Sequence, residues 1–251
     1  MSRLSVSSIK LIPFLNEDTK YDVDLCNWIY QIVYTRGFET EDGDIKIVPM
    51  GDMFNHGSDY TEIEPSYDEE GNYYAYTTYD VPAGSPLRIQ YADPTNPSFL
   101  FARYGFLDEN TPSTFCKLIP AHINKDMEEL GYSQERMLFY KNGEVSEEVW
   151  DILLYQHVSA TRVGDKRALM EAHQRGDYET KQMLHEKYYA DTSRLLLEHI
   201  EGFLEQLDKL SVKADERNTD FSDHPRLPLI IRHNQFVRDT FMTVRYRYFG
   251  Y

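Results

Sequence analysis

Three polar features of this sequence have residue types and positions that could support chemistry. The pair Asn55-His56 ends a short strand candidate between Gly51 and Gly57, and two tyrosines, Tyr91 and Tyr104, follow it. Asn and His side chains at such a turn can fix backbone groups or bind a polar ligand, and a tyrosine hydroxyl can donate or accept a hydrogen bond. Taken singly, these features are usually structural, because Asn-His pairs cap turns and tyrosines pack.

A metal site is a weaker alternative for the same region. Asp52, His56, Glu62 and Glu64 could be ligands, but their spacing fits neither a zinc nor a calcium pattern. The sequence contains neither a Gly-rich phosphate loop nor a Gly-x-Ser-x-Gly nucleophile motif. We therefore expect the site to use no metal.

The composition limits the class of partner. The 251 residues are enough for a buried core, and their formal net charge is -16. Such a surface repels nucleic acid and favours basic partners, although acidic surfaces also serve solubility alone. We expect no membrane span and no disulfide framework, because apolar runs are short and only Cys26 and Cys116 occur. A reducing compartment is expected.

The first half of the chain reads as short strands and helices that would position the polar residues. We expect an acidic loop over residues 59–70. The other expected elements are a helix over 24–36, strands over 45–48, 73–79, 87–91 and 114–119, and a helix from Asn96-Pro97 to Gly105.

The character of the sequence changes near Pro120. Residues 149–174 and 178–210 read as long amphipathic helices, residues 211–227 as a polar connection, and 229–248 as a basic final helix. One apolar stripe of the second long helix comprises Leu196, Ile200, Phe203, Leu204 and Leu207. The predicted fold class is α+β, with short strands and hairpins followed by a mostly helical part.

The motifs in combination are far more specific than their members. Pro49 to His56 resembles the Pro-Met-Ala-Asp-x-x-Asn-His signature of SET methyltransferases, and Val81 to Tyr91 resembles their following hairpin. Asn96 to Phe106 resembles their Asn-x-x-Leu-x-x-x-Tyr-Gly-Phe helix, and Trp28 to Phe38 resembles the helix that ends in Ser-Arg-x-Phe. The chain looks most like the Rubisco large-subunit lysine methyltransferases over about residues 22–110.

This resemblance implies a domain organisation and an activity. Residues 1–120 would be the C-terminal part of a SET domain, and residues 121–251 a helical substrate-binding domain. The implied activity is protein-lysine N-methylation with S-adenosyl-L-methionine, acting on a protein with an accessible lysine. The oligomeric state is left open, and so is the compartment: cytoplasm, nucleus, or chloroplast if a transit peptide precedes this sequence.

The resemblance also assigns roles to individual residues. Tyr91 would be the tyrosine at the reaction centre, and Phe38 would line the channel for the substrate side chain. The implied contacts to S-adenosylmethionine are Arg36, Asp52, Asn55, His56, Tyr104 and Phe106. Lysine has an ordinary pKa of roughly 10.4 and must lose a proton before it attacks, which a narrow aromatic channel favours by excluding water. Positioning would supply most of the rate gain.

The sequence departs from the family pattern in one large feature. The Gly-rich strand that opens such SET domains has no counterpart before the first glycine, Gly37, so we expect a truncated or degenerate form. Gly51 and Ser85 replace the usual Ala and Glu. Two alternatives stay open: a non-catalytic SET-derived protein-binding module, and a protein-histidine methyltransferase. The tyrosine at position 104 favours lysine over histidine, because related histidine methyltransferases have another residue there.

Overall fold

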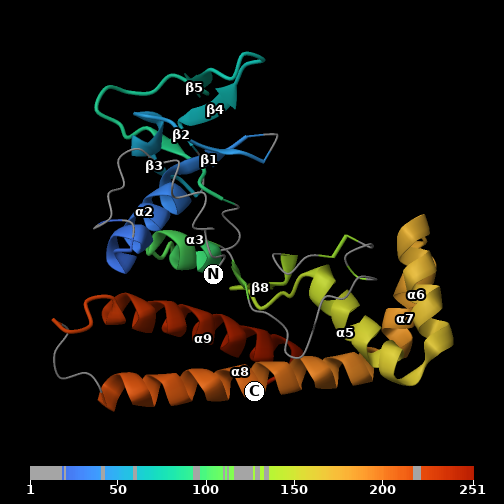
Figure 1. The fold of residues 1–251 in the computed structure, drawn as a ribbon. Helices are drawn as coiled ribbons and strands as arrows, with labels where there is room; N and C mark the ends of the chain where they lie inside the picture. The colour runs from blue at the N-terminus through green and yellow to red at the C-terminus, as the bar shows by residue number, and fades with distance from the viewer. Residues whose placement is uncertain are drawn as a thin grey trace. The chain divides into compact units, whose positions relative to one another are not determined.

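A computed structural model describes most of the chain. The described residues are 19, 21–40, 43–58, 61–92, 97–109, 111, 113–115, 127, 131–132, 136–216 and 222–251. The fold is α+β, as the sequence predicts, with short strands in small sheets and long helices (Figure 1). The chain forms two compact units, Met1–Tyr91 and Ala92–Tyr251. Each unit is described by itself. The change of character predicted near Pro120 lies outside the described residues.

The described part of the first unit contains the helix α2, a short 3-10 helix and three small sheets. Its elements are α2 (Val23–Arg36), β1 (Gly37–Glu39), β2 (Ile45–Ile47), η1 (Gly51–Met53), β3 (Asn55–His56), β4 (Ile63–Tyr67), β5 (Tyr73–Thr77) and β6 (Arg88–Ile89). Strands β1 and β2 are antiparallel, as are β4 and β5, whereas β3 and β6 pair in parallel. The predictions of strands at 45–48, 73–79 and 87–91 are confirmed in shorter form.

Helix α2 forms as predicted, but its apolar face is not buried. The Asp22 carboxylate caps the helix by accepting hydrogen bonds from the Asp24 and Leu25 amides, each at 3.0 Å. The helix ends at Gly37, where an added Cβ would lie 2.2 Å from the Ile45 Cγ2 atom, so only glycine fits. No α2 residue is buried, and Trp28 is 62% exposed. The helical spacing therefore predicts the helix without predicting a partner for it.

The prediction of an acidic loop over residues 59–70 is wrong for the central part of that range. Residues Ile63–Tyr67 form β4, which pairs with β5 in the register Ile63↔Thr77. The Asp68 carboxylate closes the hairpin by accepting from the Glu70 and Asn72 amides at 3.0 and 2.8 Å. The strand forms because a tyrosine-rich neighbour supplies its hydrogen-bond partners, which no local pattern of charges reveals.

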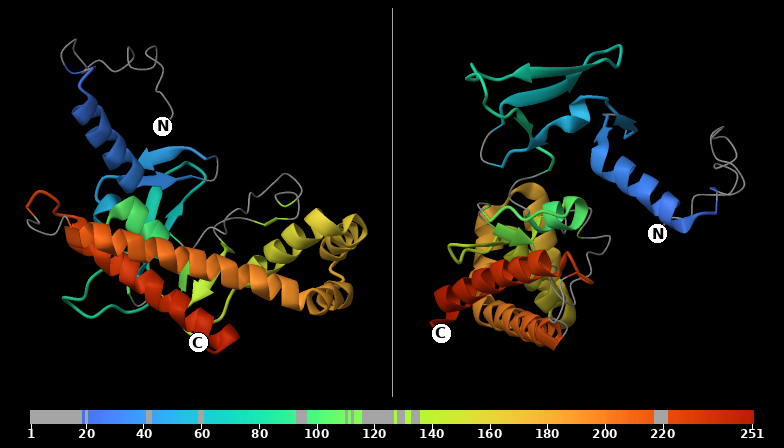
Figure 2. Two further views of the ribbon diagram at one scale, coloured as in Figure 1. Left: turned by 90° about the horizontal axis from the view of Figure 1, so that it is seen from below. Right: turned by 90° about the vertical axis from the view of Figure 1, so that its left-hand side faces the viewer.

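The second unit is mostly helical. Its elements are α3 (Pro97–Tyr104), β7 (Ser113–Phe115), β8 (Leu138–Tyr140), α5 (Glu147–Thr161), α6 (Val163–Arg175), α7 (Tyr178–Lys187), α8 (Tyr189–Glu216) and α9 (Leu227–Phe249). Helices α8 and α9 lie side by side along their length, and α5, α6 and α7 gather at one end of α8 (Figures 1 and 2). Asn96 and residues 116–119, where we predicted a helix cap and a strand end, lie outside the described residues.

Two of the long helices predicted for this unit are broken. The helix predicted over 149–174 is interrupted at Arg162, and the one over 178–210 at Tyr188. In contrast, α8 continues to Glu216, where the sequence predicted a surface connection. The final helix is confirmed and begins two residues earlier than predicted. Within the described residues, no helix combines the length and the apolar character needed to span a membrane.

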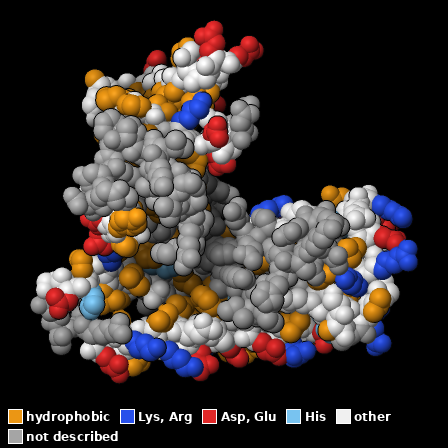
Figure 3. All heavy atoms as spheres, viewed as in Figure 1, with side chains coloured by type: hydrophobic (Ala, Val, Ile, Leu, Met, Phe, Trp, Pro, Cys, Tyr) orange, Lys and Arg blue, Asp and Glu red, His pale blue; other side chains and the backbone are white. Residues whose placement is uncertain are grey.

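The predicted apolar stripe of α8 forms the centre of the core. Four of its members are buried and Phe203 packs against them as a partly buried neighbour. Phe241 of α9 is fully buried, and its ring stacks on Phe139 at 4.6 Å and on Phe203 at 5.1 Å. The exposed face of α8 carries mostly acidic side chains with a few basic ones (Figure 3), two of which form the Arg194–Glu198 pair at 2.7 Å.

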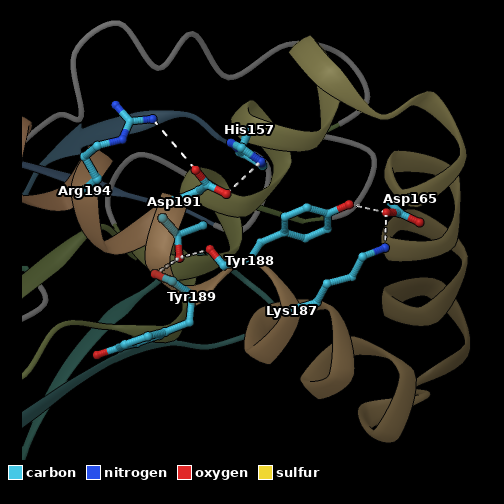
Figure 4. A network of polar contacts seen from close by, with 8 residues as sticks. His157, Asp165, Lys187, Tyr188, Tyr189, Asp191 and Arg194 are labelled. Atoms are coloured by element: carbon cyan, nitrogen blue, oxygen red, sulfur yellow. Dashed lines mark hydrogen bonds and ion pairs between the residues drawn. The ribbon is translucent and has the colours of Figure 1, made fainter.

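At the break between α7 and α8, two consecutive side chains contact α6. The Tyr188 hydroxyl donates to the Asp165 carboxylate, which also binds the Lys187 ammonium at 2.7 Å (Figure 4). Hydrogen bonds from Lys187 and Tyr188 hold the pKa of Asp165 below its ordinary value. In Figure 4 the Tyr189 ring points away from this cluster. The break therefore buries one tyrosine toward α6 and leaves the next one 54% exposed.

Candidate functional site

The predicted site of the first unit is built on a tight turn. Met50 precedes η1 with a φ of 73°, a left-handed conformation that costs a non-glycine residue about 1–3 kcal/mol. The Asp52 amide donates to the Val48 carbonyl at 3.0 Å. Gly51 is buried, and an added Cβ would lie 3.0 Å from both the Tyr73 ring and the Val48 side chain. This crowding is a physical reason for glycine where the family signature has alanine.

Tyr91 is bound to residues 54–56 through both its backbone amide and its hydroxyl. Its amide donates to the His56 Nδ1 atom at 3.2 Å, and its hydroxyl donates to the Phe54 carbonyl at 2.5 Å. The His56 and Tyr91 rings are 5.4 Å apart, and the parallel pairing His56↔Ile89 brings the two chain segments together. The structure thus unites two motifs that are well separated in the sequence.

Arg36 and Asp52 lie at the same place. The Arg36 guanidinium donates to the Asp52 carbonyl at 2.5 Å, which joins the end of α2 to the turn. Burial raises the pKa of the Tyr91 phenol; the positive charge of Arg36 lowers it and the negative charge of Asp52 raises it again. Both charges therefore act on the phenol that we predicted to be catalytic. Asn55 is exposed and pairs with Arg88 in the strand ladder.

Phe38, the predicted channel residue, belongs to an aromatic cluster with unpaired hydroxyls. Its ring contacts Tyr73 edge-on at 5.2 Å, and Tyr73 contacts Tyr67 at 5.4 Å. The hydroxyls of Tyr67 and Tyr73 are buried without a hydrogen-bond partner within the described residues, and burial raises the pKa of both phenols. An unpaired buried hydroxyl is costly unless a bound molecule satisfies it. The cluster is therefore suited to a polar group entering beside Phe38.

An ion pair that the sequence reading missed supports the strand of Asn55. The Glu62 carboxylate accepts three hydrogen bonds from Arg88: from its amide at 3.0 Å and from its guanidinium at 3.1 and 2.7 Å. We had weighed Glu62 as a metal ligand, and its charge instead pairs with Arg88. Among the described residues, no group of three or more His, Cys, Asp or Glu side chains could hold a metal ion. Tyr73, whose ring packs against the buried Gly51, was also missed.

We expect Glu62→Gln to destabilise the first unit at neutral pH. The wild type should lose the same contribution to stability in acid. The hydrogen bonds from Arg88 lower the pKa of Glu62 from 4.5 to about 2. A lowered pKa stabilises the fold fully above pH 4.5, and this contribution disappears as the pH falls through about 2. Hydrogen exchange of the β6 amides should show faster opening in the variant at pH 7 and a smaller difference near pH 2. An equally protected variant would contradict the role of this pair.

The remaining predicted residues belong to the second unit. Tyr104 ends α3, and Gly105, with a φ of 75°, terminates it as predicted. The Tyr104 and Phe106 rings are 6.2 Å apart, and the Arg103 guanidinium lies 5.4 Å above the Tyr104 ring. The predicted set is thus divided, with Tyr104 and Phe106 neighbouring each other in one unit and the other residues clustered in the other.

A buried polar cluster in the helical unit was not predicted at all. The Asp151 carboxylate accepts hydrogen bonds from the Tyr132 hydroxyl at 2.6 Å, Lys181 at 2.6 Å and His185 at 2.7 Å. Burial alone raises the pKa of Asp151, but hydrogen bonds from these three donors outweigh it and hold the pKa below its ordinary value. The sequence signal for a buried, partnered carboxylate was its position in an apolar run, residues 149–155.

No protein-family model matches the chain, and no match was found among curated proteins. The assignment to a class of protein therefore depends on the motifs and on the geometry of the residues that carry them. Of these residues, Arg36, Asp52, His56 and Tyr91 are the ones connected in the first unit.

Proposed function

We propose that this chain is a SET-type, S-adenosylmethionine-dependent protein-lysine N-methyltransferase. The observation that carries the proposal is the double attachment of Tyr91 to residues 54–56, through the Phe54 carbonyl and the His56 ring. It is supported by Arg36, whose side chain binds the Asp52 carbonyl at the same turn. The residues that match the family signature within the first unit are thus neighbours in space, although the chain separates Arg36 from Tyr91 by two strands and two hairpins.

The residue types suit methyl transfer to an amine. In this reaction the lysine nitrogen attacks the methyl carbon of the sulfonium, the carbon–sulfur bond breaks, and a proton leaves the nitrogen for water. The Tyr91 hydroxyl can direct the nitrogen through one hydrogen bond. The aromatic rings of Phe38 and Tyr73 exclude water, which favours the neutral amine over the ammonium ion. No residue is required to act as a general acid or as a metal ligand.

The proposed partner is a protein segment with an accessible lysine. The formal net charge of -16 attracts basic segments and opposes binding to nucleic acid. The charged residues of α9 are mainly basic. The negative charge that attracts a basic segment is therefore carried by the rest of the chain. Long-range attraction of this kind acts on the association rate and weakens with salt.

Calorimetric titration with S-adenosylmethionine tests the proposal directly. We expect saturable binding by the full chain, and transfer of labelled methyl groups from the bound molecule to lysine residues of a basic protein pool. S-adenosylhomocysteine should compete, and mass spectrometry should place the methyl group on a lysine Nζ atom. Absence of binding heat from a folded sample would refute cofactor binding by this chain. Methylation found on histidine would replace the lysine assignment.

The exposed apolar face of α2 favours a second candidate, a protein-binding module without catalysis. Trp28, Ile29 and Val33 lie on one side of the helix and are 62%, 39% and 38% exposed, and exposed apolar surface commonly marks an interaction site. A stable partner that is lost in Trp28→Asp, together with no methyl transfer from labelled S-adenosylmethionine, would establish this candidate. Methyl transfer that survives Trp28→Asp would favour the enzyme.

A further inference from the structure

The helical unit has an aromatic pocket that its core does not require. The pocket has a volume of about 420 Å³ and lies between α5, α7, α8 and α9. Each of these four helices contributes one large ring to its lining: Trp150, Tyr178, Tyr189 and Tyr248. Rings that served only the core would be buried, yet Tyr178 is 80% exposed and Tyr189 is 54% exposed.

The rings are arranged around Trp150. The Tyr189 ring lies 6.1 Å from the Trp150 ring at an interplanar angle of 29°, and the Tyr248 ring lies 5.3 Å away at 70°. One tyrosine therefore stacks on the indole with an offset and the other meets it edge-on. Tyr189 has this position because the helix break at Tyr188 directs the two consecutive rings to opposite sides (Figure 4).

The charged residues of the pocket favour a cation. Lys181 lines it, but its ammonium group is bound by the buried Asp151 carboxylate at 2.6 Å, so its charge is neutralised locally. Glu147, in the first turn of α5, adds an exposed carboxylate. With Asp151 and Glu147 negative and Lys181 positive, the formal charge of the lining is -1, which has the same sign as the charge of the whole chain.

We propose that this pocket binds the side-chain ammonium group of a lysine, or of a methylated lysine, in a basic protein segment. Tryptophan and tyrosine faces attract alkylammonium ions through their quadrupoles, and clusters of such rings are a recurring way of binding methylated ammonium groups. The acidic surface draws the rest of the segment. The proposal depends on the helical unit alone, so it stands or falls independently of methyl transfer by the first unit.

Trp150 itself can report the binding. The chain has two tryptophans, and Trp28 is 62% exposed in the first unit, so Trp28→Phe leaves Trp150 as the single indole emitter. We would titrate this full-length variant with N-acetyl-trimethyllysine methylamide, N-acetyl-lysine methylamide and the uncharged N-acetyl-norleucine methylamide. We expect both cations to change the Trp150 emission saturably, and the uncharged analogue to bind at least about fivefold more weakly, which corresponds to the roughly 1 kcal/mol of an exposed cation–π contact.

Three variants locate the site. Tyr178→Ala and Glu147→Gln, both at exposed lining positions, should weaken binding of the trimethylated probe by about two- to fivefold each. Tyr246→Ala is the matched control, because Tyr246 is 70% exposed on α9 and does not line the pocket. It should leave the affinity unchanged.

Several outcomes would overturn the proposal. These are an unchanged emission with every probe, equal binding of the uncharged analogue, or equal losses in the control and the lining variants. A lysine-bearing basic peptide provides the last arm of the experiment. If tetramethylammonium binds while neither the peptide nor its trimethyllysine form does, the pocket binds a free quaternary ammonium compound and the assignment to a protein segment is wrong.

Discussion

Replacing Asp151 by alanine is expected to destabilise the helical unit by about 3–5 kcal/mol, because the change leaves a buried cation without its partner. The carboxylate is 3% exposed and accepts hydrogen bonds from three donors, among them the Lys181 ammonium, whose side chain is 16% exposed. The Tyr132 hydroxyl would lose the Asp151 carboxylate as its acceptor and would keep its contact with the His173 Nδ1 atom at 2.9 Å.

Urea unfolding followed by Trp150 fluorescence in the Trp28→Phe background measures this loss in the helical unit alone. Separating the units matters, because a chain with two compact parts need not unfold in one transition. Glu205→Ala is the control: this exposed carboxylate pairs with Lys209 on the surface of α8, and its loss should cost at most about 0.5 kcal/mol. An equal loss in the two variants would contradict the role assigned to Asp151.

A double variant separates the lost charge pair from the lost packing. Asp151→Asn combined with Lys181→Met removes both charges, and we expect it to be more stable than Asp151→Ala, because no buried charge is left unpaired.

The pH dependence of the stability follows from the lowered pKa of Asp151. Its contribution is complete above the ordinary pKa of 3.8 and is lost as the pH falls further, so the wild type and Asp151→Ala should converge in stability in strong acid.

The parts of this fold that depend on neighbours in the sequence were predictable, and those that depend on distant side chains were not. The stripe of Leu196, Ile200 and Leu207 predicted both a helix and its buried face, because apolar residues at helical spacing specify the two together. The break at Tyr188 had no such signal. The Tyr188 hydroxyl there donates to Asp165, which lies in a different helix.

The same distinction applies to the candidate site. The turn over residues 51–56 and the strand before Tyr91 could be recognised from their motifs, and the pairing of β3 with β6 then brings His56 to Tyr91. The sequence placed Glu62 in a predicted acidic loop. Its ion pair with Arg88 was missed because Arg88 lies on another strand. Asp151 was passed over for a similar reason: its donors are Tyr132, which precedes β8, and two residues of α7.

Tyr91→Phe is expected to lower the rate of methyl transfer by about 10²–10³-fold, the usual cost of removing one well-placed hydrogen-bonding group from a reaction centre. The ring would remain in place, since the Tyr91 amide still donates to His56. Losing the hydroxyl contact to the Phe54 carbonyl should cost only about 0.5–1.5 kcal/mol of stability. A large loss of rate with a small loss of stability is the pattern that separates a role in the reaction from a role in folding.

The measurement is incorporation of labelled methyl groups into a lysine-bearing protein at saturating S-adenosylmethionine, with calorimetry to verify that the variant still binds it. Tyr76→Phe is the matched control, because this tyrosine is 55% exposed on β5. Burial raises the pKa of Tyr91, so its phenol stays protonated through neutral pH. An increase in the wild-type rate with pH should then reflect deprotonation of the substrate lysine. Full activity in Tyr91→Phe would remove this tyrosine from the reaction centre, and the proposed enzyme would lose the residue on which its mechanism depends.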